Sequence, residues 1–427
     1  MGDPQKNGPD VFRLPGFLPF WLAGTVSMFG SYVTALALQV IVLLSLHGTA
    51  LDVGLLNAAR WLPYLAVGLM AGALVERRRR RPILIGTDLA RGVLLLVIPA
   101  LWLLQLLSIP ALIVFAAVFG LFTLLNDSAT QSFLPRLVPT RSLLGANARI
   151  DQSSAVAETS GPLIAGALVS LIGAPLAVLV DAVSYLFSAA ALARVRVVEP
   201  RLADGPRSAI WSDIREGLRW VYRHRTLAPM AISTHVWFLF SSMLGTAFVP
   251  FLLTGLRMSP FQLGVALAAT GVGGLLGALL STRIGLRIGV GRTVMAGTTL
   301  MIVAWTIIAV VPVGPGSGSR WISLAVVALG QLLYGFALGA ENANEMAYRQ
   351  AVTPDALQGR MNATMRSLNR AAVVIGAPVG GLLADTIGFR PTFGIGIAGL
   401  LISLVIVASS PFRDARHGGL APGSVSP

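Results

Sequence analysis

The chain contains twelve long apolar runs, and these runs constrain its fold more than any other feature. Each is about 20 residues or longer, which is the length that an α-helix needs to cross a bilayer core of roughly 30 Å. Charged residues make up only 12% of the 427 residues, whereas a soluble domain has about 25%. The sequence therefore predicts an all-α membrane protein with twelve transmembrane helices. The expected spans are about 16–45, 51–75, 82–106, 109–133, 144–172, 174–196, 228–255, 260–282, 292–313, 321–345, 361–386 and 390–410.

Basic residues are distributed unevenly between the two sides of the predicted bundle. If the N-terminus faces the cytoplasm, 27 of the 32 lysine and arginine residues fall on the cytoplasmic side. The outer loops then hold only Arg257, Arg320 and Arg390. Loops rich in lysine and arginine stay in the cytoplasm. We therefore expect both termini to be cytoplasmic.

The composition also argues against several classes of function. The net charge is +14, but the arginines lie between apolar spans, so they indicate topology and no nucleic-acid partner. There are no cysteines, and the four histidines are scattered, so no metal site is predicted. The single lysine, Lys6, lies in the N-terminal tail, whereas a phosphate-binding Walker loop needs a lysine within its glycine-rich motif. We expect neither an enzyme nor a cofactor.

The longest polar gap divides the spans into six and six. The predicted organisation is a first half over 1–197, a cytoplasmic linker over 198–227, a second half over 228–410 and a disordered tail over 411–427. Within the linker, Arg215, Arg219 and Arg223 repeat every four residues, and the opposite face is apolar, which predicts an amphipathic helix. This helix either packs at the interface and links the halves, or it senses lipid and regulates the protein.

The two halves repeat each other with an offset of about 215 residues. Gly166 corresponds to Gly381, Asn147 to Asn362, and Ile172-Gly173 to Ile387-Gly388, and a weaker echo links Gly54 with Gly264. Two homologous sets of six spans are typical of a transporter with its site at the repeat interface. The sequence thus predicts two pseudo-symmetric six-helix halves.

The segment "GALVERRRRRPIL" lies between the second and third predicted spans. Its arginine block anchors the topology. The segment also resembles the signature loop of the major facilitator superfamily, G-x-L-A-D-R-x-G-R-R-x-x-L. Gly72, Arg77, Arg80 and Arg81 match this motif, Glu76 replaces its aspartate and Arg79 replaces its internal glycine. The resemblance implies the fold of that superfamily, and a loop whose contacts hold the cytosolic face closed in the outward-open state.

A second motif lies in the fifth predicted span. Gly161, Pro162 and Gly166 resemble the exporter motif G-P-x-x-G-G, and "DAVSYLFSA", "LPRLVP" and "GAN" are similar to segments of the subgroup that holds macrolide-efflux proteins and the enterobactin exporter. This resemblance implies export of hydrophobic drugs, macrolides or siderophores from a bacterial inner membrane. Many proton-coupled drug exporters carry an arginine in the fourth helix, and residues 109–133 contain none. Any proton coupling therefore depends on another residue.

Ionisable residues inside spans are costly and usually face the bundle interior or water. Asp88 and Arg91 are expected to form a local, structural ion pair. Asp127 ends the fourth span, and Glu341 and Glu345 hold the matching place on the tenth. The resemblance implies that these two helices line the cavity, so these acids serve either there or as caps at the helix ends.

Further candidates lie on the second, fifth and eleventh spans. Arg60 either attracts an anionic substrate or extends toward the membrane surface. Asp151 and Glu158 share one face of the fifth span, and Arg366 and Arg370 share one face of the eleventh. The opposite charges either close an inner gate as ion pairs or are solvated separately. Glu158 lies deepest and is the leading proton-carrier candidate.

Together these features predict a secondary active exporter that works by alternating access, with proton antiport as the energy source. Its expected partners are a hydrophobic or amphiphilic small-molecule substrate and membrane lipid, and the expected oligomeric state is a monomer. Two alternatives stay open, which are a metabolite importer with the same fold and a membrane sensor or assembly factor that does not transport.

Overall fold

The computed structural model describes residues 11–76, 78–195, 197, 210–312, 317–416 and 419–420. Within these ranges the chain forms thirteen α-helices and one short strand pair. The helices of the first half are α1 (Phe17–Val40), α2 (Ala50–Glu76), α3 (Arg80–Leu103), α4 (Ile109–Leu137), α5 (Leu143–Ile172) and α6 (Ala174–Arg194). The linker contains α7 (Ile210–Arg223), and the second half contains α8 (Leu227–Pro250), α9 (Pro260–Ile288), α10 (Val290–Ala309), α11 (Ser317–Val352), α12 (Asp355–Thr386) and α13 (Phe389–Ala408). The strands β1 (Ala415–Arg416) and β2 (Gly419–Leu420) are antiparallel, with Ala415 opposite Leu420.

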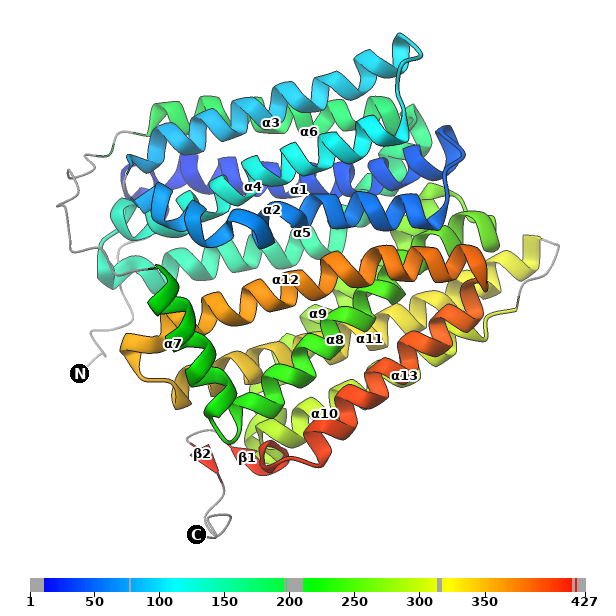
Figure 1. Cartoon of the computed structure of the whole chain (residues 1–427). Coiled ribbons are helices and arrows are strands. Elements are labelled where there is room, and N and C mark those ends of the chain that lie inside the picture. The colour runs from blue at the N-terminus through cyan, green and yellow to red at the C-terminus, as the bar shows by residue number, and fades with distance from the viewer. Residues whose placement is uncertain are drawn as a thin grey trace, which may run out of the picture.

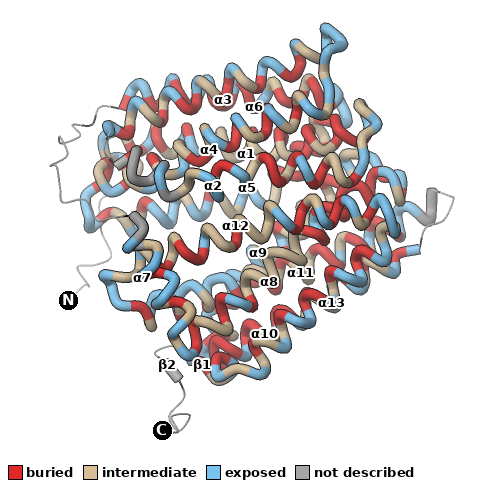
Figure 2. Tube along the Cα trace, viewed as in Figure 1, coloured by how far each residue is buried: buried red, intermediate tan, exposed pale blue. Residues whose placement is uncertain are grey.

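The twelve predicted spans correspond to the twelve helices other than α7, which confirms the predicted fold class. Eleven of them are long and apolar enough, in their described residues, to cross a membrane. The twelfth, α2, has 27 residues and packs between α4 and α12. Large apolar side chains such as Leu103, Leu171 and Leu279 are exposed. Figure 2 shows exposed positions along the outer sides of the helices and buried ones where helices face each other. This is the pattern of a bundle whose outer surface meets lipid.

The two halves have equivalent internal packing. In the first half α1 packs on α5 and α6, α3 packs on α4 and α6, and α2 packs on α4. In the second half α8 packs on α12 and α13, α10 packs on α11 and α13, and α9 packs on α11. Both first helices also end in a π-helical turn, η2 (Ile41–Ser45) and η4 (Phe251–Gly255), followed by a residue with positive φ, His47 and Arg257. The internal repeat is therefore present in the structure as well as in the sequence.

The long helices share two ends. The start of α1, the end of α13 and the linker helix α7 lie at one end of the bundle, which we call the α7 end (Figure 1). The loops between α1 and α2, α5 and α6, α8 and α9, and α12 and α13 lie at the opposite end, which we call the far end. The helix order thus alternates direction, as expected for a chain that crosses a bilayer repeatedly.

The two halves meet along two equivalent helix pairs, α2 with α12 and α5 with α9. A Cβ added to Gly264 of α9 would lie 2.5 Å from the carbonyl oxygen of Pro162, and one added to Gly54 of α2 would lie 2.5 Å from that of Ala377. Only glycine permits backbones to approach so closely. At the far end, the carboxylate of Asp385 also accepts hydrogen bonds from the backbone N–H groups of Ala50 (3.0 Å) and Leu51 (2.8 Å).

The buried apolar core shows that the halves separate toward the α7 end. One large cluster of buried residues includes both halves, for example Leu36 and Phe248. At the α7 end, by contrast, a cluster around Phe17 and Phe133 contains first-half residues, and another around Tyr348 and Phe412 contains second-half residues. The bundle is closed at the far end and open at the α7 end.

The predicted amphipathic linker helix is present as α7, and it docks on the second half. Val221 is buried with Met361 and Met365 of α12, and Glu216 forms an ion pair of 2.5 Å with Arg360. Tyr222 hydrogen-bonds His235 of α8 over 2.8 Å, and the other ring nitrogen of His235 lies 2.7 Å from Asn369 of α12. The arginine face is exposed at Arg215, Arg219 and Arg223.

The sequence predicts disorder from residue 411, and this prediction is wrong for the first part of the tail. Pro411–Asp414 form the 3₁₀ helix η5, and Phe412 is fully buried, with its ring centroid 5.3 Å from that of Tyr348. The apolar side chain of Phe412 explains the docking, because its burial removes a large apolar area from water. Residues 417–418 and 421–427 lie outside the described residues.

Candidate functional site: cavities between the two halves

Two connected cavities lie in the interior of the bundle. The first, with a volume of about 620 Å³, is lined by α1 to α6, and we call it the N-half cavity. The second, of about 350 Å³, lies between the halves against α1, α2, α5, α8, α9, α10 and α11, and we call it the central cavity. Tyr32, Ala35 and Glu158 line both. A substrate could therefore contact both halves at once, as expected for a site at a repeat interface.

Aromatic side chains form much of the cavity wall. Phe20, Trp21 and Tyr32 of α1 line the N-half cavity. The central cavity has a second aromatic wall that the sequence did not point out, which consists of Phe248, Trp305 and Tyr334. The ring of Trp305 lies 5.8 Å from that of Phe248 and 5.7 Å from that of Tyr334. Such surfaces bind apolar ligands and retain few water molecules.

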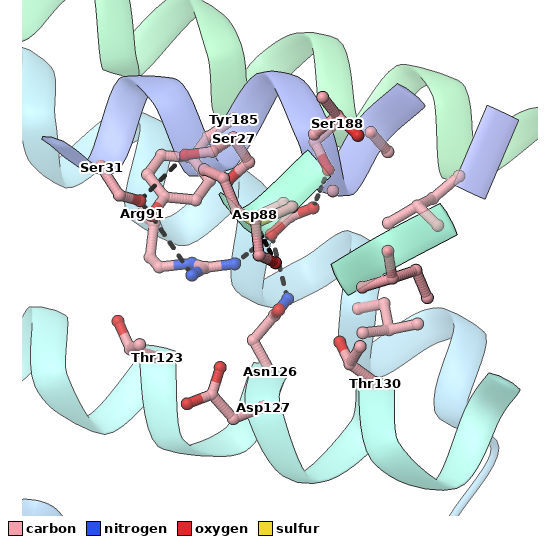
Figure 3. Close-up of a pocket in the computed structure, with 18 of the residues that line it drawn as sticks. Ser27, Ser31, Asp88, Arg91, Thr123, Asn126, Asp127, Thr130, Tyr185 and Ser188 are labelled. Atoms are coloured by element: carbon pink, nitrogen blue, oxygen red, sulfur yellow. Dashed lines mark hydrogen bonds and ion pairs between the residues drawn. The ribbon is translucent and has the colours of Figure 1, made fainter. Parts of the chain in front are cut away.

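A buried ion pair forms part of the floor of the N-half cavity (Figure 3). Arg91 donates to Asp88, as predicted from their spacing on α3. Asn126 of α4 donates to Asp88 over 3.0 Å, and Ser188 of α6 donates to the other carboxylate oxygen over 2.5 Å. Arg91 also lies over the ring of Tyr185, 4.2 Å from its centroid. These contacts pair the two charges, and the pair ties three helices together.

Asp181 on α6 is a buried acid that the sequence analysis noted only as part of a family-like segment. Its side chain is fully buried. Thr34 of α1 donates to one carboxylate oxygen over 2.5 Å, and Ser184 donates to the other over 2.9 Å. The absence of Cβ at Gly30 makes room for this carboxylate. No pattern of residue spacing in the sequence indicates that α1 packs on α6, so this contact could not be predicted.

Glu158 lies where the N-half and central cavities meet. Its side chain is exposed to the cavities, and it lines both of them. Within the described part of the chain it forms no ion pair. Its backbone carbonyl lies against Gly271 of α9, so the residue sits at the seam between the halves. Among the acids proposed from the sequence, Glu158 lines the N-half and central cavities, and Asp127 also lines the N-half cavity.

The other acid of the fifth helix lies outside the cavities. Asp151 is exposed near the α7 end of α5, and Arg366 is exposed on α12. In the open arrangement seen here, and within the described residues, no ion pair links them. The gate pairing suggested by the repeat therefore remains a prediction for a state that is closed at the α7 end.

A third cavity, of about 360 Å³, lies between α2, α4 and α12, and we call it the α12 cavity. It is lined by Asp127, Arg366 and Arg370 together with neutral polar residues. The hydroxyl of Tyr64 donates to Asp127 over 2.6 Å. The guanidinium of Arg370 lies over the ring of Trp61, 3.7 Å from its centroid, across the seam between the halves. Arg60 lies elsewhere, in the lining of the N-half cavity.

Glu341 and Glu345 are brought together in the second half, away from the described cavities. Thr298 of α10 donates to Glu341 over 3.3 Å, and Thr234 of α8 donates to Glu345 over 3.3 Å. Glu345 also pairs with Arg349 at 3.8 Å. The two acids therefore connect α8, α10 and α11. They do not line the three cavities described above.

Part of the predicted signature loop can be placed. Gly72 and Glu76 lie in the last turns of α2, where the side chains are not described, and Arg77 lies outside the described residues. Arg80 is buried, and Arg81 donates to the backbone oxygens of Leu192 (3.2 Å) and Ala193 (2.6 Å) at the end of α6. Arginine suits this position because the carbonyls at a helix C-terminus carry partial negative charge.

The loop's departure from the superfamily motif changes its backbone. Arg79 has φ −65°, whereas Gly289, at the equivalent turn of the second half, has φ 88°. Only glycine adopts such a positive φ readily. Among the described residues of the loop between α2 and α3, none has a positive φ.

The predicted exporter motif forms the contact between α5, α1 and α9. A Cβ added to Gly161 would meet the ring of Tyr32 at 2.6 Å, and one added to Gly166 would meet the carbonyl oxygen of Pro260 at 2.6 Å. The carbonyl oxygen of Pro162 lies against Gly264. The motif thus brings one wall of the cavities against the other half at the closed end of the bundle.

This fold, with two equivalent halves around a cavity, defines a polytopic membrane transporter. The profile of the transmembrane secretion effector family matches residues 10–424, so the chain belongs to that family, which is part of the major facilitator superfamily.

The chain is 28% identical over 398 residues to the multidrug efflux pump Tap of Mycolicibacterium fortuitum, covering 90% of this chain and 93% of the pump. It is 26% identical over 429 residues to the enterobactin exporter EntS of Escherichia coli, covering 96% of both chains. These relatives match the exporter subgroup indicated by the sequence motifs.

The fold is also that of a bacterial homologue of the iron transporter ferroportin, at 17% identity. Its inward-facing structure matches with a TM-score of 0.69 and covers 92% of this chain and 97% of that one. The outward-facing structure of a bacterial ferroportin homologue matches with a TM-score of 0.58, covering 93% of this chain and 99% of that one.

Proposed function

We propose that this protein is a secondary active exporter of hydrophobic or amphiphilic small molecules in the bacterial inner membrane. The observation that carries the proposal is a cavity between two equivalent halves that is closed at the far end and open at the α7 end. The positive-inside rule puts the arginine-rich α7 end in the cytoplasm. With this orientation the structure is the inward-open state, ready to load substrate from the cytoplasm or the inner leaflet.

Transport in this proposal follows alternating access. The halves rock about the cavity, so that the α2–α12 and α5–α9 contacts open at the far end while the α7 end closes. The glycine contacts and the Asp385 cap of α2 hold the present state closed to the outside. Their location at one end makes them suited to reversible separation. A single chain contains both halves and the cavity, so we expect a working monomer.

Export as the direction, and a broad apolar substrate range, are supported by the relatives and by the cavity wall. The similar proteins are named as a multidrug efflux pump and an enterobactin exporter. Phe248 and Trp305 pack behind the wall of the central cavity with 2% exposure each, and the partly exposed rings of Tyr32 and Tyr334 can stack on different ring systems without requiring a fixed hydrogen-bond pattern.

We further propose that the proton gradient drives export and that Glu158 carries the proton. The gradient supplies about 1.4 kcal/mol per pH unit and about 2.3 kcal/mol per charge per 100 mV. Glu158 is supported by its place at the junction of the two cavities, where substrate and proton can compete for one carboxylate. Buried Asp181 and paired Asp88 lack this access.

The test is an efflux assay with a panel of hydrophobic fluorescent compounds in cells that express the wild type, Glu158→Gln or Asp355→Asn. We expect the wild type to export some of them, a protonophore to stop export, and Glu158→Gln to lower the rate at least about tenfold, because it removes the proton carrier. Asp355→Asn is the control, since Asp355 is an exposed acid outside the three cavities. Export that survives the protonophore, or normal export by Glu158→Gln, would overturn the coupling proposal.

A further inference from the structure

The α12 cavity contains more positive than negative charge. Its charged lining residues are Arg366, Arg370 and Asp127. The two arginines lie four residues apart and therefore on one face of α12. Asp127 is already engaged by the hydroxyl of Tyr64. Within the described residues neither arginine forms an ion pair with an acid, so the repulsion between two nearby guanidinium groups is not offset by such a pair.

Arg370 is held in place but is not saturated with hydrogen-bond partners. Its guanidinium lies over Trp61 and close to Tyr64, with ring-centroid distances of 3.7 and 5.8 Å. Its Nε is buried and has no hydrogen-bond partner among the described residues. A guanidinium over an aromatic face keeps its N–H donors in its own plane, where they can still bind an oxygen ligand. A buried donor without a partner is unfavourable, so a bound acceptor would stabilise the site.

Neutral polar groups complete the cavity from both halves. Ser128 and Gln131 of α4 line one side, and Asn362 and Ser367 of α12 line the other. Two guanidinium groups surrounded by hydroxyl and amide groups suit a carboxylate or a phosphate, because guanidinium binds both in a bidentate manner. The two arginines repel cationic ligands, and neutral acceptors form weaker hydrogen bonds with them than anions do.

We propose that the α12 cavity is an anion subsite that binds the carboxylate or phosphate of an amphiphile through Arg366 and Arg370. This inference rests on the proposed function and narrows its substrate class to molecules with an apolar body and an acidic group. The apolar body of the ligand occupies the aromatic cavities. The subsite adjoins them at Asp127, because this residue lines both the N-half cavity and the α12 cavity. An anion here contacts α12 of one half and α2 or α4 of the other, at the side that must close during transport.

The test measures binding to purified protein in phosphatidylcholine nanodiscs by energy transfer from tryptophan to pyrene, with empty nanodiscs subtracted. The probes are 1-pyrenebutyrate and 1-pyrenebutanol, which differ in the acidic group. We expect the wild type to bind the acid at least about tenfold more tightly than the alcohol, the size expected of one charge-assisted contact. Arg366→Gln and Arg370→Gln should each remove most of this preference, and Arg366→Lys should retain part of it.

Two further variants make the test specific. Arg283→Gln, at an exposed position on α9 outside the three cavities, should keep the preference. Asp127→Asn should strengthen binding of the acid and leave the alcohol unchanged, because it removes a competing negative charge. Size-exclusion profiles and melting curves show which variants are folded. Equal wild-type affinities for acid and alcohol, or an unchanged preference in folded Arg366→Gln and Arg370→Gln, would overturn the proposal.

The anion can come from lipid or from a soluble substrate. Nanodiscs that contain phosphatidylglycerol distinguish these sources. Weaker binding of pyrenebutyrate assigns the site to a lipid headgroup, and unchanged binding assigns it to soluble acids.

The binding assay requires no transport. Efflux of neutral compounds without any preference for the acid probe refutes the anion subsite alone, whereas acid binding without gradient-driven efflux refutes the proposed export alone.

Discussion

At the scale of residues, the interior of the first half is organised around charges that are satisfied in different ways. Asp88 is neutralised by Arg91 and receives two further hydrogen bonds, whereas Asp181 receives bonds from hydroxyl groups of Thr34 and Ser184. Glu158 is reached from both cavities and has neither kind of partner within the described residues. Partnered groups of this kind stabilise the bundle, and a group without a partner is available for a ligand or a proton.

The Asp88–Arg91 pair gives a prediction about stability. Arg91→Gln leaves the carboxylate of Asp88 buried without its counter-charge, so the free energy of unfolding should fall by about 3–5 kcal/mol. Adding Asp88→Asn removes the stranded charge and should recover part of this loss. Denaturant titration of the purified variants measures both effects. A double variant that is destabilised by the full sum of the two single variants would show that the residues do not act as a pair.

Sequence reasoning at this scale succeeded where partners are close in the chain and failed where they are distant. The i, i+3 spacing of Asp88 and Arg91 indicated their pairing, and the structure contains it. The contact of Asp181 with Thr34, and that of Arg370 with Trp61, join helices far apart in the sequence. Such contacts depend on how helices are rotated and paired, which apolar periodicity does not specify.

At the scale of elements, helix positions were predictable because apolar length and polar loops determine where spans can lie. The expected run over 109–133 became Ile109–Leu137, and that over 361–386 became Asp355–Thr386. At the α7 end both helices extend beyond the expected spans. These extensions carry polar residues, so a search for apolar runs alone leaves them out of the span. The π-helical turns Ile41–Ser45 and Phe251–Gly255 were not predictable, because their residues are ordinary helix-forming apolar residues.

The glycine contacts between α5 and α9 give a prediction about helix packing. Gly264→Ala places a Cβ 2.5 Å from the carbonyl oxygen of Pro162, so the helices must separate, and overpacking of this kind costs about 1–3 kcal/mol. Gly54→Ala should behave in the same way at the equivalent contact. We expect both variants to have lower melting temperatures and slower efflux.

Gly394→Ala is the matched control on α13, because its added Cβ meets nothing within 4 Å. Alanine favours a helix more than glycine does, by up to about 1 kcal/mol, so this variant should be as stable as the wild type or slightly more so. If Gly264→Ala behaved like Gly394→Ala, the seam would not depend on close backbone contact.

At the scale of the whole molecule, the equivalent halves fit the proposed alternating access, in which one chain exposes its cavity to either side. The contacts of Gly54 with Ala377 and of Gly264 with Pro162 are related by the internal repeat. The far end is therefore closed by two similar seams flanking the central cavity. Because the buried core divides into separate first-half and second-half clusters at the α7 end, the halves can approach there as nearly rigid bodies.

The central claim is that the halves rock about the cavity, and distances across the two ends test it most directly. The chain has no cysteines, so spin labels can be placed without a background. The exposed pairs are Ser45→Cys with Ile387→Cys at the far end, and Arg141→Cys with Arg287→Cys at the α7 end. Pulsed electron resonance in nanodiscs, across a pH series and with an exported compound, measures both distances. The account predicts a population in which the far-end distance lengthens while the α7-end distance shortens. Distances that stay constant, or that change in the same direction at both ends, would contradict it.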